Sequence, residues 1–366
     1  MTRKLGEMGT FIKGAPLSKA DISDEGTPFI LYGELYTTYS EVTNSVKRKT
    51  DKTVEHQFYS KIGDVIMPTS GETPEDIATA SCIMIPDVIL AGDLLIYRTE
   101  QIDGRFVSFC VKNKVNKQIS SVAQGKSVVH VRAEELSKIS VTFPALDEQQ
   151  KILSLLESID RRIATQQKLI ETLKKYKRGL LQVMFPQKGA TVPKLRLAGF
   201  AGAWEQRKLG EILKTLPFKV YLKVPEQGGK FEIIQQGNDP IIGFANGEPC
   251  NEFRDIVIFG DHTLSLYKPK RPFFVATDGV RILQGVNEMD GNYLLSLLEK
   301  NKPISEGYKR YYSILADREV FFTNNRDEQK QIGALFENLD NLIIFHQSKL
   351  VLLRKQKNGL LQQLFI

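Results

Sequence analysis

Two blocks of the chain, residues 147–186 and 327–366, place apolar side chains at intervals that alternate between four and three residues. The alternation continues for about four heptads in each block, which is typical of a coiled-coil seam. Both blocks open on an aspartate, where the dipole of a helix N-terminus favours negative charge. The pattern predicts two long helices with these pairing positions: Ile152, Leu156, Ile159, Ile163, Gln166, Ile170 and Leu173, then Ile332, Phe336, Leu339, Ile343, His346, Leu350 and Leu353.

The two predicted helices are copies of one unit. They align without a gap at an offset of 180 residues, and seventeen of the forty paired positions are identical. A shorter echo, RKLGE, begins at Arg3 and again at Arg207. A repeat of this length indicates a supersecondary unit that the chain uses twice.

One equivalent pair of polar residues, Gln166 and His346, interrupts the middle of both seams. If the helices pair antiparallel, the two side chains meet near the midpoint of each helix. A single polar layer in an apolar seam can fix register and orientation. The alternative is that both residues are merely tolerated at the edge of the seam.

The remaining sequence carries short β-branched and aromatic runs broken by turn residues, which indicates strands. The runs are TPFILYGEL, GDVIMP, CIMIPDVIL, DLLIYR and RFVSFCVKN in the first half, and KFEIIQQ, DIVIFG, LSLYKP, PFFVATD and VRILQGV in the second. Each half also contains an aspartate, an apolar stretch and a closing Gly-Asp, at residues 87–93 and 255–261.

The predicted fold class is α+β with a pseudo-two-fold internal repeat. Two globular, mixed α/β domains alternate with the two long helices. The predicted boundaries are 1–145 for the first domain, 146–186 for the first helix, 187–203 for a linker, 204–325 for the second domain and 326–366 for the second helix.

Charge and composition narrow the class of protein. The net charge is +7 with a pI of about 9.0, which permits a polyanionic partner such as nucleic acid. The three cysteines, Cys82, Cys110 and Cys250, have no metal-like spacing and fit buried thiols in a reducing cytosol. No apolar run is long enough for a membrane span, and the start lacks a signal-peptide core. We therefore expect a cytoplasmic protein without a membrane partner.

No catalytic or metal-binding constellation is recognisable. The stretch Gly125-Lys126-Ser127 lacks the earlier glycine of a phosphate-binding loop, because Ser120 stands at that position. The four histidines are scattered and make no ligand pair. We expect a chain that has no catalytic residues, no metal and no cofactor of its own.

The whole chain resembles the specificity subunits of Type I restriction-modification systems. The resemblance rests on the doubled helix block with its Asp-Glu-Gln start and Lys-x-Gly-Leu-Leu-Gln end, the lead-in LAGFAGAWEQRKLGE, and the segment ISVTFPALDEQQKI. It implies two target-recognition domains, each reading one half of a split, asymmetric DNA sequence. It also implies that the two helices pair antiparallel, hold the domains apart and dock two modification subunits.

The resemblance also implies where the reaction chemistry of such a bacterial defence complex resides. S-adenosyl methionine would bind in the adenine methyltransferase subunits, and ATP and Mg in the restriction (motor) subunits, which this chain would meet only indirectly. The partners expected for this chain are double-stranded DNA and two methyltransferase subunits.

Basic and polar clusters outside the helices are the candidate DNA contacts, since Lys and Arg bind phosphates and polar side chains read bases. They are Lys47, Arg48, Lys49, Lys52, Lys112, Lys114, Lys117, Gln124 and Lys126 in the first domain, and Lys268, Lys270, Arg271, Tyr308, Lys309, Arg310 and Tyr311 in the second. Neutralising the 268–271 cluster is expected to weaken DNA binding and to flatten its salt dependence. A charge cluster is, however, more often a solvated surface than a binding site.

Two rival functions remain open. The chain could be a two-domain coiled-coil scaffold that binds proteins and not DNA, against which the positive charge argues. It could also be an enzyme with an unrecognised active site, such as a stand-alone nuclease. Salt-sensitive binding to duplex DNA together with a methylase partner would distinguish the first rival, and cleavage by the chain alone would support the second.

Overall fold

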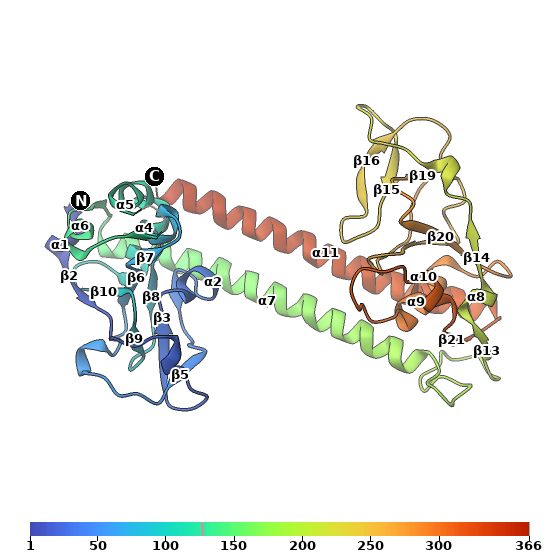
Figure 1. Cartoon of the computed structure of the whole chain (residues 1–366), viewed down its shortest axis with the longest axis horizontal. Coiled ribbons are helices and arrows are strands. Elements are labelled where there is room, and N and C mark those ends of the chain that lie inside the picture. Colours follow the sequence, from blue (N-terminus) through green and yellow to red (C-terminus); the bar gives the residue numbers. More distant parts are fainter. Residues whose placement is uncertain (126–127, 366) are drawn as a thin grey trace. The chain divides into compact units, whose positions relative to one another are not determined.

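The computed structural model describes residues 1–125 and 128–365. The chain divides into two compact units, Met1–Thr165 with Val351–Ile366, and Gln166–Leu350. Each unit combines one globular domain with parts of the two long helices, α7 (Leu146–Met184) and α11 (Arg326–Leu364) (Figure 1). The two long helices pack together, as the heptad spacing predicts.

Local chemistry sets the ends of the long helices. The Asn325 side chain accepts hydrogen bonds from the backbone N–H groups of Asp327 and Glu328, both at 3.0 Å, and so caps the start of α11. Helix α7 ends at Met184, two residues before Pro186, whose ring is incompatible with a continuing helix. Each helix has 39 residues, so each is roughly 58 Å long at 1.5 Å per residue.

The first domain has a five-stranded sheet in the order β2-β10-β6-β8-β4, a three-stranded sheet in the order β5-β3-β9, and the pairs β1-β12 and β7-β11. Its strands are β1 (Thr2–Lys4), β2 (Gly9–Lys13), β3 (Thr27–Leu31), β4 (Val42–Thr43), β5 (Arg48–Thr50), β6 (Asp64–Pro68), β7 (Ser70–Gly71), β8 (Ser81–Ile83), β9 (Ile89–Ala91), β10 (Leu94–Thr99), β11 (Val129–His130) and β12 (Ser140–Thr142). Its helices are α1 (Leu5–Met8), α2 (Glu34–Thr37), α3 (Pro74–Ile77), α4 (Gly104–Asn113), α5 (Asn116–Val122) and α6 (Ala133–Ser137).

The second domain has a four-stranded sheet in the order β14-β20-β17-β18, a three-stranded sheet in the order β16-β15-β19, and the pair β13-β21. Its strands are β13 (Glu205–Lys208), β14 (Leu213–Leu216), β15 (Phe231–Ile234), β16 (Ile241–Ala245), β17 (Ile256–Gly260), β18 (Leu266–Tyr267), β19 (Phe273–Val275), β20 (Val280–Gly285) and β21 (Glu319–Phe322). Its helices are α8 (Leu209–Ile212), α9 (Gly291–Asn301) and α10 (Tyr312–Ala316).

The same topology occurs in both domains. Strand β3 pairs antiparallel with β5 and parallel with β9, and β15 pairs antiparallel with β16 and parallel with β19. Strand β10 lies antiparallel between β2 and β6, as β20 does between β14 and β17. The internal repeat therefore extends from the long helices through domains whose sequences no longer align.

Nine of the ten predicted strand runs contain a strand, but the run RFVSFCVKN is wrong, because it forms helix α4. The side chain of Asp103 accepts a hydrogen bond from the backbone N–H of Arg105 and caps this helix. The six successive residues from Phe106 to Val111 are all buried, so the helix shows neither a helical stripe nor a strand alternation. Its counterpart α9 in the second domain is likewise buried on several sides.

The two Gly-Asp stretches of the sequence are not structural counterparts. Residues 89–91 form β9 of the three-stranded sheet, whereas residues 256–260 form β17 of the four-stranded sheet. In the shared topology, β17 of the second domain is equivalent to β6 of the first, and β19 of the second domain is equivalent to β9 of the first. A short apolar run that ends in Gly-Asp therefore marks a buried strand and its turn, but not a particular strand of the fold.

The segment between the long helix α7 and the second domain is anchored to the second unit. Arg196 makes two hydrogen bonds, at 2.7 and 2.9 Å, to the fully buried carboxylate of Glu328 at the start of α11. Trp204 packs against Phe185 and Tyr293, with ring centroids 5.6 and 6.1 Å away. The buried tryptophan is thus a packing residue where the domain meets the end of α7.

Candidate nucleic-acid interface and helix pair

The predicted seam positions of the two long helices are buried or partly buried. Within the first unit, Leu156 of α7 shares a hydrophobic core with Leu361 and Phe365 near the end of α11. Within the second unit, Phe336 near the start of α11 shares a core with Met184 at the end of α7. Each unit therefore pairs the beginning of one helix with the end of the other, so the pairing is antiparallel. The structure buries eight of the fourteen predicted positions and leaves six partly exposed: Leu156, Ile159, Gln166, Ile170, Ile332, Phe336, Ile343 and Leu353 are buried, and Ile152, Ile163, Leu173, Leu339, His346 and Leu350 are partly exposed.

The polar pair in the seam makes direct contact. The Nε2 atom of Gln166 lies 2.6 Å from Nδ1 of His346 and donates to the His346 backbone carbonyl at 3.1 Å. Since Nε2 of glutamine is a donor, Nδ1 of His346 is the acceptor in this contact. The contact satisfies the buried Gln166 amide within the seam and disfavours an offset pairing that would separate the two side chains.

Two equivalent lysines form ion pairs across the helices. The Nζ atom of Lys177 lies 2.7 Å from Asp340 of α11 and 2.6 Å from Glu299 of α9. The Nζ atom of Lys357 lies 2.7 Å from Asp160 of α7 and 4.0 Å from Glu41 of the first domain. Lys177 and Lys357 are separated by 180 residues, as are Asp160 and Asp340. The repeat therefore builds twice the same joint, by which we mean the contacts that attach one domain to the two long helices. The seam periodicity places both lysines at covered positions but gives no indication of their partners.

The two domain carboxylates of these joints differ in acidity. Burial raises the pKa of Glu299 above its usual value, and the neighbouring ammonium of Lys177 only partly opposes this. Burial also acts on Glu41, but the hydrogen bond and positive charge of Lys112, with a contribution from Lys357, hold the Glu41 pKa below its usual value. Glu299 and Glu41 therefore both lie beside the repeated lysine, but in two different electrostatic environments.

The basic cluster at β5 is the more open of the two candidate groups in the first domain. Lys47, Lys49 and Lys52 are exposed, and Nζ of Lys52 lies 3.6 Å from the carboxylate of Asp51. Arg48 is half-buried and pairs with the buried Glu34 at 2.9 Å. Three of the four cations of this cluster thus project into solvent.

The second candidate group of that domain lies on α4, α5 and the turn that follows. Lys112 pairs with Glu41 at 2.8 Å, Lys114 is partly exposed, and Lys117 is exposed. Gln124 donates to Glu135 at 3.2 Å, and Lys126 lies outside the described residues. Figure 1 shows α4 and α5 at the end of the domain opposite β5, so the structure does not bring the two groups together.

A groove beside β5 contains further cations that the sequence clusters missed. Its volume is about 1020 Å³, and Lys13, Lys19 and Arg48 line it with the aromatic rings of Tyr32 and Phe58. Lys13 and Lys19 are isolated in the sequence, so no charge run signals them. Only the folded chain places them on the same side as Arg48.

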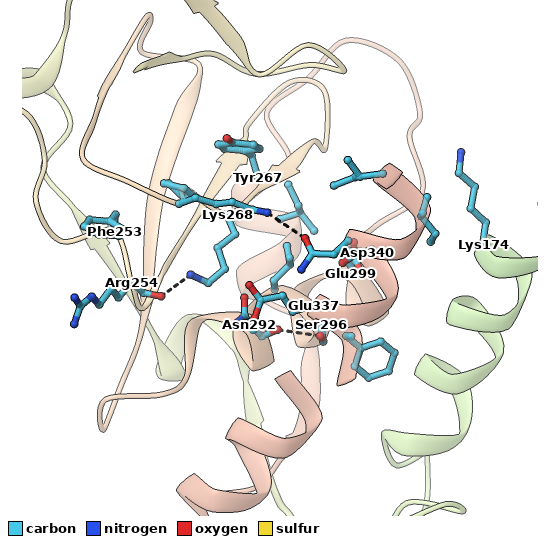
Figure 2. Close-up of a pocket in the computed structure, with 18 of the residues that line it drawn as sticks. Lys174, Phe253, Arg254, Tyr267, Lys268, Asn292, Ser296, Glu299, Glu337 and Asp340 are labelled. Atoms are coloured by element: carbon cyan, nitrogen blue, oxygen red, sulfur yellow. Dashed lines mark hydrogen bonds between the residues drawn. The ribbon is translucent and has the colours of Figure 1, made fainter. Parts of the chain in front are cut away.

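The cations of the 268–271 cluster are engaged within the second unit. Lys268 donates to the Arg254 backbone carbonyl at 2.6 Å, and Lys270 donates to Asn341 of α11 at 3.1 Å. Both lysines line a cleft of about 550 Å³ whose other wall includes α9 and α11 (Figure 2). Burial lowers the pKa of the Lys268 ammonium, although nearby carboxylates such as Asp255 oppose the shift. Arg271 outside the cleft pairs with Glu232 at 2.5 Å and lies over the Phe244 ring.

The 308–310 loop is the most exposed candidate of the second domain. Tyr308 is 87% exposed, and its ring stacks on His262 with centroids 4.6 Å apart and an interplanar angle of 5°. Lys309 pairs with Glu306 at 2.6 Å, and Arg310 is exposed. This loop presents an aromatic face and two cations together.

Tyr311 does not belong to that surface. Its side chain is fully buried; its hydroxyl accepts from the Glu306 N–H at 2.7 Å and donates to the Gly307 carbonyl at 2.7 Å. Its backbone N–H donates to the buried carboxylate of Asp261 at 3.0 Å. Tyr311 therefore holds the loop in place from inside, and its buried side chain is not available for contact with DNA.

Residues 1–125 and 128–365 contain no group of three or more His, Cys, Asp or Glu side chains arranged to hold a metal ion. Over the same residues, no helix combines the length and the apolar character of a membrane span.

Each unit thus joins a mixed α/β domain of one topology to parts of the same antiparallel helix pair, and each domain has exposed cations. The family model of the Type I restriction modification DNA specificity domain matches residues 1–175. The Type I restriction enzyme MjaVIII specificity subunit of Methanocaldococcus jannaschii is 22% identical over 403 residues, which cover 99% of this chain and 91% of that relative. The putative type I restriction enzyme MjaX specificity subunit of the same organism is 23% identical over 224 residues, 60% of this chain and 43% of that relative.

Solved structures share the fold. The Type I restriction-modification S subunit from M. genitalium matches with a TM-score of 0.67 and 18% identity, over 100% of this chain and 96% of that one. A chain from a study of complex assembly and conformational transition of the type I R-M system matches with a TM-score of 0.56 and 15% identity, over 100% and 97%. Over its full length this chain is thus similar to the specificity subunits of Type I restriction-modification systems, and residues 1–175 match the DNA specificity domain of that family. The resemblance seen in the sequence is confirmed.

Proposed function

We propose that residues 1–145 and 204–325 are two target-recognition domains, each of which reads one half of a split double-stranded DNA target. The observation that carries this proposal is one topology built twice with different surfaces. The first domain presents a basic cluster at β5, and the second presents an aromatic and basic loop at residues 308–310. Two unlike surfaces on one repeated frame favour a target whose half-sites differ.

The proposed DNA contacts are the candidates that remain exposed. Lys47, Lys49 and Lys52 would bind phosphates, since they project into solvent and DNA affinity rests largely on such contacts. Tyr308 would contact sugar or base, because its outer face is open and its inner face is already ordered by His262. The cations of the 268–271 cluster are weaker candidates for DNA contact. They are already bound within the protein by Asn341, Arg254 and Glu232.

The paired helices would set the distance between the half-sites. Half-sites that are read from one face of the duplex lie about one helical turn, ~34 Å, apart. A helix of 39 residues is longer than this, roughly 58 Å. The antiparallel contacts support a helix pair of constant length, because residues of both helices pack into the hydrophobic core of each unit.

The outer sides of the helices would dock two modification subunits. Exposed apolar residues on both helices support this, because such surface is uncommon on a helix that faces only water. The side chains include Leu155, Leu169 and Tyr176 on α7, and Leu342, Ile344, Phe345, Val351 and Leu352 on α11. In this arrangement S-adenosyl methionine belongs to the modification subunits, and ATP and Mg to the restriction subunits. The chain itself would supply recognition and no catalytic step.

The test is methylome sequencing of cells that express the complete system, compared with cells that lack this chain. We expect methylated adenines in one motif made of two unlike half-sites with an unread gap, and loss of that methylation without the chain. A continuous motif without a gap, or methylation that persists without the chain, would overturn the proposal.

A further inference from the structure

We propose that Gln149 and Gln329, together with the ion pairs of Lys177 and Lys357, are positioning residues that make the complex selective for the length of the gap between half-sites. The inference rests on the proposed function. It assigns gap selectivity not to the helices alone but to matched joints that attach each domain to them.

The joints begin at one helix of each domain. Helix α4 follows Asp103 and α9 follows Asp290, and each aspartate accepts a backbone hydrogen bond from the first turn of its helix, at 2.9 and 3.0 Å. Each helix opens on a glycine, Gly104 or Gly291, where a Cβ would collide with a backbone carbonyl that precedes the central strand β6 or β17. The two helix starts are thus built alike and pressed against equivalent parts of the sheet.

A glutamine from each long helix holds that start. The Oε1 atom of Gln149 accepts from the backbone N–H of Asp103 at 3.1 Å, and its Nε2 donates to the Pro144 carbonyl at 2.9 Å. The Oε1 atom of Gln329 accepts from the backbone N–H of Asp290 at 3.1 Å, and its Nε2 donates to the Thr323 carbonyl at 2.7 Å. Both side chains are buried, at 1% and 4% exposure, so no water replaces these bonds.

A second contact lies two turns farther along each long helix. Arg105 of α4 pairs with Glu157 of α7 at 2.5 Å, and Asn292 of α9 donates to Glu337 of α11 at 2.8 Å. Glu157 and Glu337 are equivalent positions of the repeat. Asn292 and Glu337 appear together at the cleft of the second unit (Figure 2).

The lysine pairs close each joint from the partner helix. Lys177 of α7 contacts both Asp340 of α11 and Glu299 at the far end of α9. Lys357 of α11 contacts Asp160 of α7 and approaches Glu41, whose backbone carbonyl accepts from Ser108 of α4. Both long helices therefore grip each domain, and contacts near both ends of α9 fix its direction as well as its position.

These contacts account for the polar identities of the repeat. Gln149/Gln329, Glu157/Glu337, Asp160/Asp340 and Lys177/Lys357 are all identical pairs, although the domains that they hold have diverged. Within one chain, the part that attaches the readers has thus stayed the same while the readers have changed. This is expected if the joint sets where a reader stands and not what it reads.

The experiment measures gap selectivity of the full chain assembled with its modification subunits. The substrate is a plasmid library that carries the half-sites found in the wild-type methylome, separated by the native gap or by gaps one and two base pairs shorter or longer. The test variant is Gln149→Leu with Gln329→Leu. The matched control is Gln150→Leu with Gln331→Leu. It changes exposed glutamines that lie one residue after Gln149 and two residues after Gln329.

We expect the test variant to lower the ratio of native-gap to altered-gap methylation by roughly tenfold, since a misplacement of about 1 Å at a reacting centre can cost about a hundredfold in rate. The control should keep the wild-type ratio. Lys177→Met should act like the glutamine variant and Lys177→Arg should restore selectivity, with Lys175→Met as the exposed control.

A ratio is insensitive to loss of folded protein, which lowers methylation at all gaps alike. An unchanged ratio in the glutamine and lysine variants would overturn the inference. If the glutamine variant does not fold, Arg105→Ala with Asn292→Ala removes one partly exposed contact from each joint and carries the same expectation with a smaller effect. A wild-type complex that methylates no split motif would instead refute the proposed function itself.

Discussion

Glu299 and Glu41 contact equivalent lysines, yet their pKa values are shifted in opposite directions. A raised pKa means that ionised Glu299 costs stability, and this cost develops as the pH rises through the range between the usual and the raised value. A lowered pKa means that Glu41 contributes stability above its usual pKa and loses it as the pH falls toward the lowered value. The two carboxylates therefore affect acid stability with opposite sign.

We expect Glu41→Gln to destabilise the chain at about pH 7 by about 1.5–3 kcal/mol, since hydrogen bonds to charged groups contribute this much, and to matter less at about pH 4. Glu299→Gln should improve relative to wild type as the pH rises over the same interval. Melting temperatures of both variants across this range measure the effect, with the exposed Glu248→Gln as control. Parallel pH profiles for the two variants would contradict the assignment.

The basic clusters differ in how far their charges are already used. We expect Lys47→Gln, Lys49→Gln and Lys52→Gln together to weaken DNA binding by the assembled complex and to reduce the salt slope by about one unit per lost phosphate contact. Neutralising Lys268, Lys270 and Arg271 should flatten the slope less, because these cations have partners within the protein. Titrations of duplex DNA at several salt concentrations measure both slopes. An unchanged slope in the first variant would remove the β5 cluster from the contact surface.

For single residues, the sequence shows which loops are rich in cations and aromatic side chains, but it does not predict which of those side chains are exposed. Tyr308 and Tyr311 are three residues apart in one polar loop, but one is 87% exposed and the other is fully buried. Lys13 and Lys19 reach the groove beside Arg48 only through the fold. Exposure of a loop residue depends on distant partners such as Asp261, and a local pattern contains no information about them.

Among the elements, the long helices are the most predictable part of the molecule. Their periodicity is local and is repeated for about four heptads, so it selects covered positions without knowledge of the partner. Helix α4 was not predictable in the same way, because burial on several sides removes any periodicity. The joints escaped prediction too: Gln149 is one of several glutamines, and its role depends on Asp103, forty-six residues earlier.

The polar layer tests whether the seam encodes its register. Replacing Gln166 and His346 with Leu should raise stability by about 1–2 kcal/mol, since two buried polar groups give way to apolar ones. It should also broaden the register, because no unique pair remains to be satisfied. Spin labels at the exposed positions Lys168 and Lys349 report this as a broadened distance distribution. A single narrow distribution, identical to that of the wild-type seam, would show that the layer does not define the register.

At the scale of the whole molecule, the internal repeat explains why the two domains share one topology. Divergence of the two copies explains why their surfaces differ. The joints and the seam are the retained part, and the loops at residues 47–52 and 308–310 are the divergent part. This division predicts that half-site sequence and gap length can be changed independently. Loop residues should alter the bases that are read, whereas helix residues should alter only their separation.

The most direct test lengthens the helices and reads the gap. One heptad is inserted beside Gln166 in α7 and one beside His346 in α11, which preserves the phase of the seam and adds about 10.5 Å to each helix, or about three base pairs of DNA. Methylome sequencing should then report the same two half-sites with a gap about three base pairs longer. An unchanged gap, or altered half-site bases, would contradict the claim that the helix pair sets the spacing of two independent readers.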